Sequence, residues 1–362
     1  MDRRLNIGKC LVKLIAVVMR NLSELESSLR KLVEAIGVSG YEEAVRETIR
    51  GMLPSGAETK VDSIGNLIAT IGRGEPHVVF LAHMDELGYL VSNIEENGFI
   101  KLRKIGSLDD RYMPGKILQV HTSKGPVEGV IGLTPPHLTL DPESSKKVLQ
   151  YHEVFLDLGT RSKDETLSTG VRPLDPVTLR KELRVINGVY YCCRSIDDRF
   201  GCLALIEVLK RLNSNRPDRK LTFVWTVQEE TGLGGAKVIA NTLKVDKAIP
   251  VDSYPSGDAP LTQFHLAPNR LGEGPVLRVV DYGATANPTM VERVKKIAKK
   301  HGIPLGAGPT GGYTDGVALQ EKGVPMVPVT IPIRYMHSPV EMCHKKDLEN
   351  LIELLTFVAA EI

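Results

Sequence analysis

The sequence predicts an α/β domain that is interrupted by a small all-β domain. Apolar runs of strand length alternate with amphipathic helical stretches before residue 87 and after residue 181, which is typical of α/β domains. Residues 87–181 instead hold short alternating runs that are broken by pairs such as Pro114-Gly115 and Gly125-Pro126, with little helical periodicity. A chain of 362 residues is long enough to form both domains.

The elements of the α/β domain follow one another in a regular order. A helix begins near Ser23, and a strand follows at residues 77–82. Beyond the interruption come a helix after Asp197 and three strands, at residues 221–227, 247–251 and 327–332. The last helix has an apolar face that consists of Leu348, Leu351, Ile352, Leu355 and Val358. We therefore expect the α/β domain to occupy residues 19–86 and 182–362, and the β domain residues 87–181.

The first residues are expected to lie outside the folded domains. The apolar run from Leu11 to Met19 is interrupted by Lys13, is too short to span a bilayer and lacks a signal-peptide cleavage pattern. We expect residues 1–18 to be an extension that is either disordered or not translated.

Composition narrows the class of protein. A net charge of +2 with 25% charged residues gives no electrostatic reason to expect a nucleic-acid partner. The five cysteines have no CxxC spacing, which favours reduced thiols over a disulfide framework. We expect a cytoplasmic protein that binds neither nucleic acid nor membrane.

Residues of metal-binding type occur at or near the ends of the predicted strands. The set consists of His83, Asp197, Glu230, Asp252 and His337. His83, Glu230 and Asp252 end or directly follow apolar strands, His337 lies shortly beyond another, and Asp197 precedes a helix. Open α/β sheets place their sites at this edge. These residues are therefore expected to meet.

Two His and three carboxylates match the needs of a two-metal site. Two divalent ions about 3.5 to 4 Å apart need a shared carboxylate, further ligands on each ion, and a base that takes a proton from the attacking water. Glu229 is next to a candidate ligand and is free to be that base. Asp85 lies two residues after His83 on the same side of the strand, where it can accept the second ring N–H of His83. Mixed imidazole and carboxylate ligands suit zinc, cobalt or manganese.

Five segments resemble the tetrahedral aminopeptidase family, whose members include glutamyl and deblocking aminopeptidases and have been mislabelled as cellulases or endoglucanases. The segments are His83–Gly88 (HMDELG), Ser195–Gly201 (SIDDRFG), Gln228–Ala236 (QEETGLGGA), Val251–Asp252 and Arg334–Pro339 (RYMHSP). They occur in family order from about Leu22 to the C-terminus.

The resemblance implies a zinc-peptidase-like α/β/α sandwich with a PDZ-like β insertion that serves assembly into a tetrahedral dodecamer. It further implies an aminopeptidase that removes N-terminal residues from short peptides with two divalent ions per subunit, Zn²⁺ or Co²⁺. Carried over by motif, Asp197 bridges both ions, His83 and Asp252 complete one, and Glu230 and His337 the other. Glu229 is the general base, Asp85 is the partner of His83, and the Asp197-Asp198 peptide is cis.

The chain departs from the family in two places. The family's Gly-Gly-Thr-Asp-Ala stretch is replaced by Gly311–Gly316 (GGYTDG), with an added Tyr313. The pair Cys192-Cys193 also precedes the segment that holds Asp197. Neither departure changes a predicted ligand.

Other functions use part of the same residue set. A metal-dependent deacylase or carboxypeptidase would share the ligands and the base. A glycosidase acting through Glu229 and Glu230 is disfavoured, because adjacent strand residues point to opposite faces. Singly, each candidate has a structural alternative, such as a capping Asp252 or a turn at His337. A non-enzymatic scaffold would not need the whole set.

Overall fold

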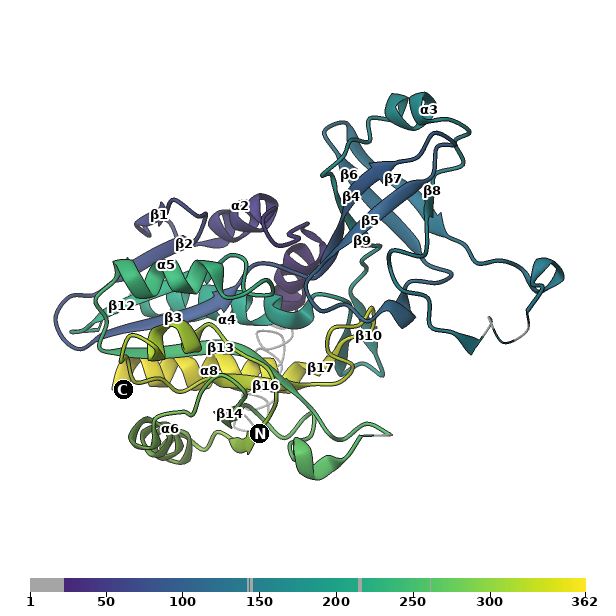
Figure 1. The fold of residues 1–362 in the computed structure, drawn as a ribbon. Helices are drawn as coiled ribbons and strands as arrows, with labels where there is room; N and C mark the ends of the chain where they lie inside the picture. The colour runs from purple at the N-terminus through teal and green to yellow at the C-terminus, as the bar shows by residue number, and fades with distance from the viewer. Residues whose placement is uncertain (1–22, 142, 144–145, 214–216, 261) are drawn as a thin grey trace, which may run out of the picture.

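The computed structural model describes residues 23–141, 143, 146–213, 217–260 and 262–362. The expected extension, residues 1–18, lies outside the described residues. The chain forms an α/β/α sandwich from which a closed β-barrel projects (Figure 1), so the predicted fold class is confirmed.

The sandwich is built on an eight-stranded sheet in the order β1-β2-β12-β3-β13-β16-β14-β15. The strands are β1 (Thr59–Val61), β2 (Leu67–Ile71), β3 (His77–His83), β12 (Lys220–Thr226), β13 (Lys247–Pro255), β14 (Val276–Val280), β15 (Gly306–Pro309) and β16 (Val329–Ile333). The four central strands, β12, β3, β13 and β16, are parallel. Their carboxyl ends therefore meet at one edge of the sheet.

Both faces of the sheet are buried, as the apolar sequence of β3 predicts. Val78 and Phe80 point to the face that packs against α4 and α8, whereas Val79 and Leu81 point to the face with α5 and α7. The helices of the sandwich are a helix over residues 23–34, α2 (Glu43–Met52), α4 (Ile196–Asn213), α5 (Gly234–Thr242), α6 (Pro288–His301), α7 (Gly316–Gln320) and α8 (Lys345–Glu361). Alternation along the strand thus creates the two helical layers.

The closed barrel has the strand order β4-β5-β8-β7-β6-β9. Its strands are β4 (Gly88–Ile94), β5 (Ile100–Ile105), β6 (Ile117–Thr122), β7 (Gly125–Ile131), β8 (Leu156–Asp157) and β9 (Pro176–Leu179), with the short helices η1 (Asp110–Tyr112), η2 (Pro136–Leu138) and α3 (Lys163–Ser168) between them. The barrel has its own apolar core, which includes Tyr89, Leu102 and Val177. It is therefore packed independently of the sandwich core.

A second, three-stranded sheet lies where the chain returns from the barrel. It consists of β10 (Arg184–Ile186), β11 (Tyr190–Cys192) and β17 (Met342–His344), all antiparallel. A further short helix, η4 (Phe264–Leu266), lies between β13 and β14. Since β11 leads into the segment with Asp197 and β17 follows the segment with His337, this small sheet joins two parts of the predicted site.

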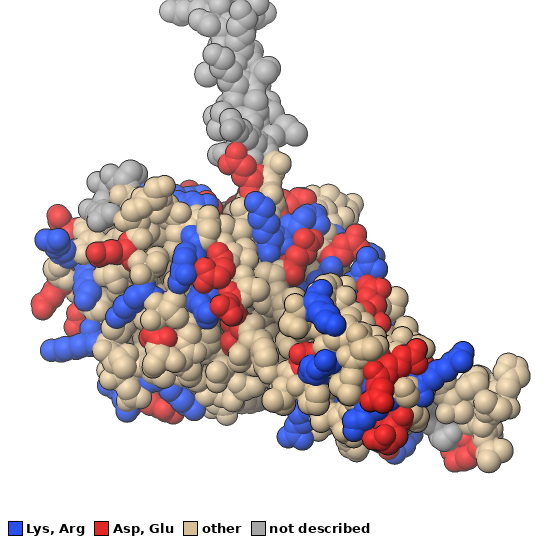
Figure 2. Space-filling view, turned by 90° about the horizontal axis from the view of Figure 1, so that it is seen from above, with Lys and Arg blue, Asp and Glu red and all other residues tan. Residues whose placement is uncertain are grey.

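Neither positive nor negative charge predominates on the face seen in Figure 2, where acidic and basic side chains are interspersed. Across the described part of the chain, no helix is both long and apolar enough to cross a membrane. The cytoplasmic location stays a prediction.

Candidate metal centre and active site

The candidate residues converge because their strands are in register. Thr226, the last residue of β12, pairs with His83, the last residue of β3. Pro250 of β13 pairs with Leu81 of β3, and continuing this register by two residues sets Asp252 level with His83. Residues that are distant in sequence are thereby brought to one edge of the sheet.

The prediction that β13 ends before Asp252 is wrong. The strand continues to Pro255, because beyond Pro250 it keeps pairing with β16, from Val251 opposite Val329 to Pro255 opposite Ile333. Asp252 nevertheless lies two residues beyond Pro250, the last residue of β13 that pairs with β3, and level with the end of that strand.

Asp197 lies at an irregular start of α4. Its backbone angles and those of Asp198 are non-helical, and the peptide between them is cis, as the family resemblance implied. The side chain is 5% exposed, and Oδ2 accepts a hydrogen bond from Ser253 Oγ at 2.9 Å. The Oδ1 atom is buried without a hydrogen-bond partner among the described residues.

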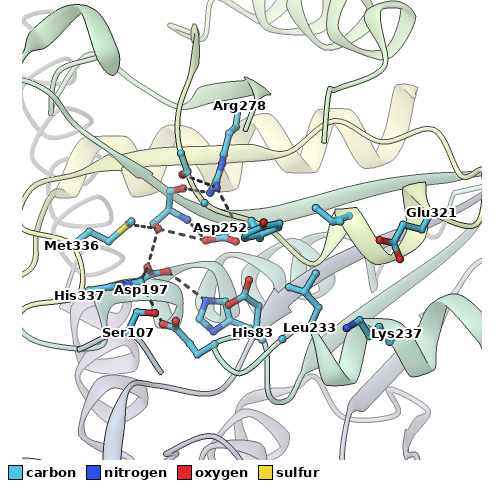
Figure 3. Close-up of a pocket in the computed structure, with 18 residues that line it drawn as sticks. His83, Ser107, Asp197, Leu233, Lys237, Asp252, Arg278, Glu321, Met336 and His337 are labelled. Atoms are coloured by element: carbon cyan, nitrogen blue, oxygen red, sulfur yellow. Dashed lines mark hydrogen bonds and ion pairs between the residues drawn. The ribbon is translucent and has the colours of Figure 1, made fainter. Parts of the chain in front are cut away.

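Two groups of side chains share Asp197. One group consists of His83, Asp197 and Asp252, the other of Asp197, Glu230 and His337, and the nearest ligand atoms within each group lie within 4.8 Å of one another. His83 Nε2 is 3.4 Å from Asp197 Oδ1, and His337 Nε2 is 3.6 Å from Asp197 Oδ2. Each imidazole therefore faces a different oxygen of the same carboxylate (Figure 3).

These distances fit metal ligation. Two ligand atoms that are each about 2.0–2.1 Å from a tetrahedral zinc ion are about 3.3 Å apart. The contacts of 3.4 and 3.6 Å at Asp197, and that of 3.6 Å between His337 Nε2 and Glu230 Oε1, are close to this spacing and long for direct hydrogen bonds. The buried Asp197 Oδ1 without a partner also calls for a cation. The side chains present thus fit the divalent ions that they were predicted to hold.

The electrostatics of the cluster point the same way. Burial, together with the Asp197 carboxylate, raises the pKa of Asp252 to about 6 and that of Glu230 to about 7. Although burial opposes the change, the carboxylates of Glu230 and Asp197 raise the pKa of His337 to about 10. The cluster holds protons because its negative charge is in excess, and a divalent cation can replace those protons.

Asp85 holds more of the site than the sequence suggested. The ring Nδ1 of His83 is 3.2 Å from the Asp85 carbonyl oxygen and 3.5 Å from Oδ1. The two carboxylate oxygens also accept the backbone N–H groups of Glu229 at 2.9 Å and Glu230 at 3.1 Å, and Ser39 Oγ donates at 2.6 Å. One buried side chain therefore positions both the candidate base and the candidate ligand beside it.

Glu229, the candidate base, lies in the loop after β12 and lines the same cavity as the two groups. Burial is the main cause that raises its pKa, and the carboxylates of Asp252 and Glu230 add to it. A carboxylate with a raised pKa is a stronger proton acceptor than one with an ordinary pKa, as a general base needs to be.

The cavity around the site has a volume of about 520 Å³. Besides the metal-binding candidates, its lining includes Ser107, Leu233, Lys237, Arg278, Tyr313 and Glu321. Ser107 follows β5 of the barrel, so the barrel contributes to the site. In Figure 3, Lys237 and Glu321 lie at the end of the cavity opposite Met336 and His337.

The segment that departs from the family is fixed by Arg278. This buried guanidinium donates hydrogen bonds to the carbonyl oxygens of Gly311 at 3.2 Å and Tyr313 at 3.0 Å, and its Nε is 3.3 Å from Asp281 Oδ2. The Tyr313 side chain is 55% exposed at the rim. The added residue therefore changes the cavity wall and not the metal-binding groups.

Three residues of the site have no counterpart among the predicted roles. Ser253 donates to Asp197, Asp315 accepts a hydrogen bond from Thr226 Oγ, and Glu341 accepts backbone N–H groups of the candidate ligands. Of the three, Asp315 lies in the segment Gly311–Gly316, to which the sequence drew attention without giving Asp315 a role, whereas nothing in the sequence singled out Ser253 or Glu341.

The fold and the site together define a metal-dependent hydrolase. A family model described as M42 glutamyl aminopeptidase matches residues 65–354. The chain belongs to this family and is a metal-dependent aminopeptidase.

Similar proteins cover nearly the whole chain. The lysyl aminopeptidase of Pyrococcus furiosus is 30% identical over 340 residues, which are 92% of this chain and 96% of that protein. The TET1 peptidase of Pyrococcus horikoshii, described as assembling into a tetrahedron or a large octahedral shell, is 41% identical and superposes with a TM-score of 0.88 over 93% of this chain and 100% of its own. A structure from Thermotoga maritima described as an endoglucanase is 30% identical, with a TM-score of 0.74 over 92% and 96% of the chains.

Proposed function

We propose that this aminopeptidase works with two divalent ions, one held by His83, Asp197 and Asp252 and the other by Asp197, Glu230 and His337. The observation that carries this proposal is the shared carboxylate, whose two oxygens face the two imidazoles at 3.4 and 3.6 Å. When bound, the ions polarise the scissile carbonyl and make a water nucleophilic at neutral pH. Zinc and cobalt both accept this ligand set.

Glu229 is the general acid and base of the proposed reaction. Its carboxylate takes a proton from the attacking water and delivers it to the nitrogen of the leaving amine. The raised pKa of Glu229, which arises mainly from burial, supports this role because such a carboxylate binds a proton more tightly than an ordinary one. Asp85 fixes the backbone of Glu229 and so limits where the carboxylate can point.

The substrates are short peptides whose N-terminal side chain enters the cavity. The wall beyond the metal-binding groups is apolar at Leu233 and Val317 and carries Lys237 and Glu321. An extended side chain of either charge meets a partner there, since Lys237 attracts acids and Glu321 attracts bases. Relatives named lysyl and glutamyl aminopeptidase are compatible with both choices.

The assembly is proposed to be a tetrahedral dodecamer of identical subunits. The support is the likeness to a solved dodecamer of PhTET1-12s, which is 41% identical, with a TM-score of 0.86 over 93% of this chain and 99% of its own. Light scattering of the purified chain tests the subunit number.

The experiment that tests the function compares substrates on the chelated enzyme after zinc, cobalt or manganese is restored. Hydrolysis of aminoacyl-anilides that depends on added metal supports the aminopeptidase. Hydrolysis of N-acyl amino acids alone favours a deacylase or carboxypeptidase with the same ligands. Cleavage of a glucan by the chelated enzyme would favour the glycosidase alternative, which the endoglucanase description of one relative keeps relevant.

A further inference from the structure

Glu341 lies directly beside the second group of candidate ligands. It precedes β17, and its side chain is 3% exposed. Oε2 accepts the backbone N–H of Asp197 at 3.1 Å, and Oε1 accepts the backbone N–H of His337 at 3.0 Å. One carboxylate therefore holds the main chain of two residues that are 140 positions apart in the sequence.

The surrounding backbone keeps Glu341 in this place. Arg334 and Met342, which flank the loop that carries His337, exchange two backbone hydrogen bonds of 2.9 and 3.0 Å. The Glu341 carbonyl oxygen accepts the N–H of Cys193 at 3.0 Å, next to the pairing of β11 with β17. The side chain thus lies between two segments that the small sheet already joins.

The loop needs a partner inside it because its backbone is irregular. Tyr335 and His337 both have positive φ, 57° and 61°, which L-residues adopt rarely. In this conformation the N–H of His337 points at Glu341, and the bond fixes the residue from which the imidazole projects. The same carboxylate fixes the start of the Asp197 segment.

The two groups of ligands depend on Glu341 to different degrees. Asp197 and His337 are two of the three members of the second group, whereas the first group shares only Asp197 with it. His83 is held by Asp85, and Asp252 Oδ1 accepts the N–H of Ser253 at 2.6 Å. Loss of Glu341 removes support mainly from the second group.

We propose that Glu341 is a positioning residue that sets the affinity of the second metal ion, the one held by Asp197, Glu230 and His337. The inference rests on the proposed two-metal function. Glu341 acts through the backbone of two ligands and does not touch substrate. Removing an outer partner of this kind lowers metal affinity by about 10- to 100-fold.

The test is calorimetric titration of Co²⁺ alone into metal-free wild type and Glu341→Gln. Glutamine keeps the volume but can accept only one of the two N–H bonds, since its NH₂ group is a donor. We expect two Co²⁺ ions in the wild type and a 10- to 100-fold weaker second ion in the variant, with the first ion changed less than about threefold. Visible absorption of Co²⁺ reports the same loss independently of turnover.

Two further variants, each of which retains only one group of ligands, show which ion Glu341→Gln weakens. In Asp252→Ala, which retains the second group, Glu341→Gln should weaken the remaining ion. In His337→Ala, which retains the first group, the same change should leave the remaining ion unaltered within about threefold. Equal weakening in both backgrounds, or no weakening in either, overturns the assignment.

Asp347 provides a matched control. Like Glu341 it is a buried carboxylate that accepts two backbone N–H groups, those of Gly272 at 2.7 Å and Gly274 at 2.8 Å, but it belongs to neither group of ligands. Asp347→Asn should lower the melting temperature of the metal-free chain and leave both Co²⁺ affinities unchanged. If wild type binds no pair of Co²⁺ ions, the proposed function fails. If wild type binds two and Glu341→Gln binds them equally well, only the role of Glu341 fails.

Discussion

The backbone N–H of Glu229 donates a hydrogen bond of 2.9 Å to Asp85 Oδ1, and Asp85 also lies 3.5 Å from the ring Nδ1 of His83 through the same oxygen. One carboxylate therefore orients a candidate ligand and the candidate base. We expect Asp85→Asn to reduce metal affinity or kcat/KM by about 10- to 100-fold, because its amide group cannot accept both neighbouring N–H groups. Metal content and kinetics of the same sample measure the two effects separately. A metal affinity and a kcat/KM that both equal those of the wild type would show that Asp85 orients neither the ligand nor the base.

Glu229→Gln should keep the metals and lose turnover. The amide has the size of the carboxylate but cannot accept the proton of the attacking water, so kcat should fall by about 100- to 10,000-fold. Metal analysis of the purified variant should match that of the wild type, since Glu229 belongs to neither group of ligands. Near-normal kcat would show that another residue is the base.

Asp197→Asn should lower the binding of both ions. Asp197 is the member that the two groups share, and an amide replaces one of its oxygens by a donor. By contrast, Asp252→Asn should affect one ion more than the other. The number of Co²⁺ ions bound per subunit and their affinities, measured by titration, compare the variants. Two ions bound to Asp197→Asn with wild-type affinity would exclude the bridging role.

Lys237 and Glu321 should tune the preference for the N-terminal side chain in opposite directions. Because both side chains are exposed in the cavity wall, each is expected to change kcat/KM by only about 2- to 5-fold, as exposed charge pairs contribute up to ~1 kcal/mol. Lys237→Ala should disfavour glutamyl-anilide, and Glu321→Ala should disfavour lysyl-anilide. Leucyl-anilide is the neutral control. Parallel changes on all three substrates would contradict a role in side-chain choice.

His121 should make a contribution to stability that is lost as the pH falls from 6.5 to 4. Burial, with help from Lys181, lowers the pKa of His121 to about 4, from an ordinary value of 6.5. Between these values His121 binds a proton more readily in the unfolded chain than in the folded chain, so its contribution to the free energy of unfolding decreases as the pH falls from 6.5 to 4. The carboxyl groups of Glu230 and Asp252, whose pKa values are raised, act in the opposite direction, so the test compares two proteins. In urea unfolding of the chelated protein, the free energy of unfolding of the wild type should decrease relative to that of His121→Gln as the pH falls from 6.5 to 4. An equal dependence of the free energy of unfolding on pH in both proteins would assign the effect to other groups.

The sequence predicted the parts of the site that depend on strand order. His83, Glu230 and Asp252 were placed together because parallel strands end at one edge of a sheet, and the register of β3, β12 and β13 brings these segments to that edge. The end of β13 was predicted wrongly because an apolar run does not reveal which neighbouring strand continues to pair. Here β16 extends the pairing to Pro255.

The roles of Glu341 and Asp85 could not be predicted to the same depth. Both carboxylates accept backbone N–H groups from residues about 140 positions away, and any amino acid but proline offers such a donor. The pattern of side chains therefore contains no signal for these bonds. The contact between Asp85 and His83 was predicted on the assumption that both residues lie on one side of a strand. In the structure β3 ends at His83, and Asp85 reaches the ring from the segment that follows the strand.

The most direct test of the two-metal aminopeptidase is a stepwise return of Co²⁺ to the chelated enzyme, with bound metal and hydrolysis of an aminoacyl-anilide followed together. A two-metal aminopeptidase should have no activity when chelated, should bind two ions per subunit at saturation, and should reach full activity only when the second ion has bound. Full activity in the thoroughly chelated enzyme, or saturation at one ion with full activity, would contradict it.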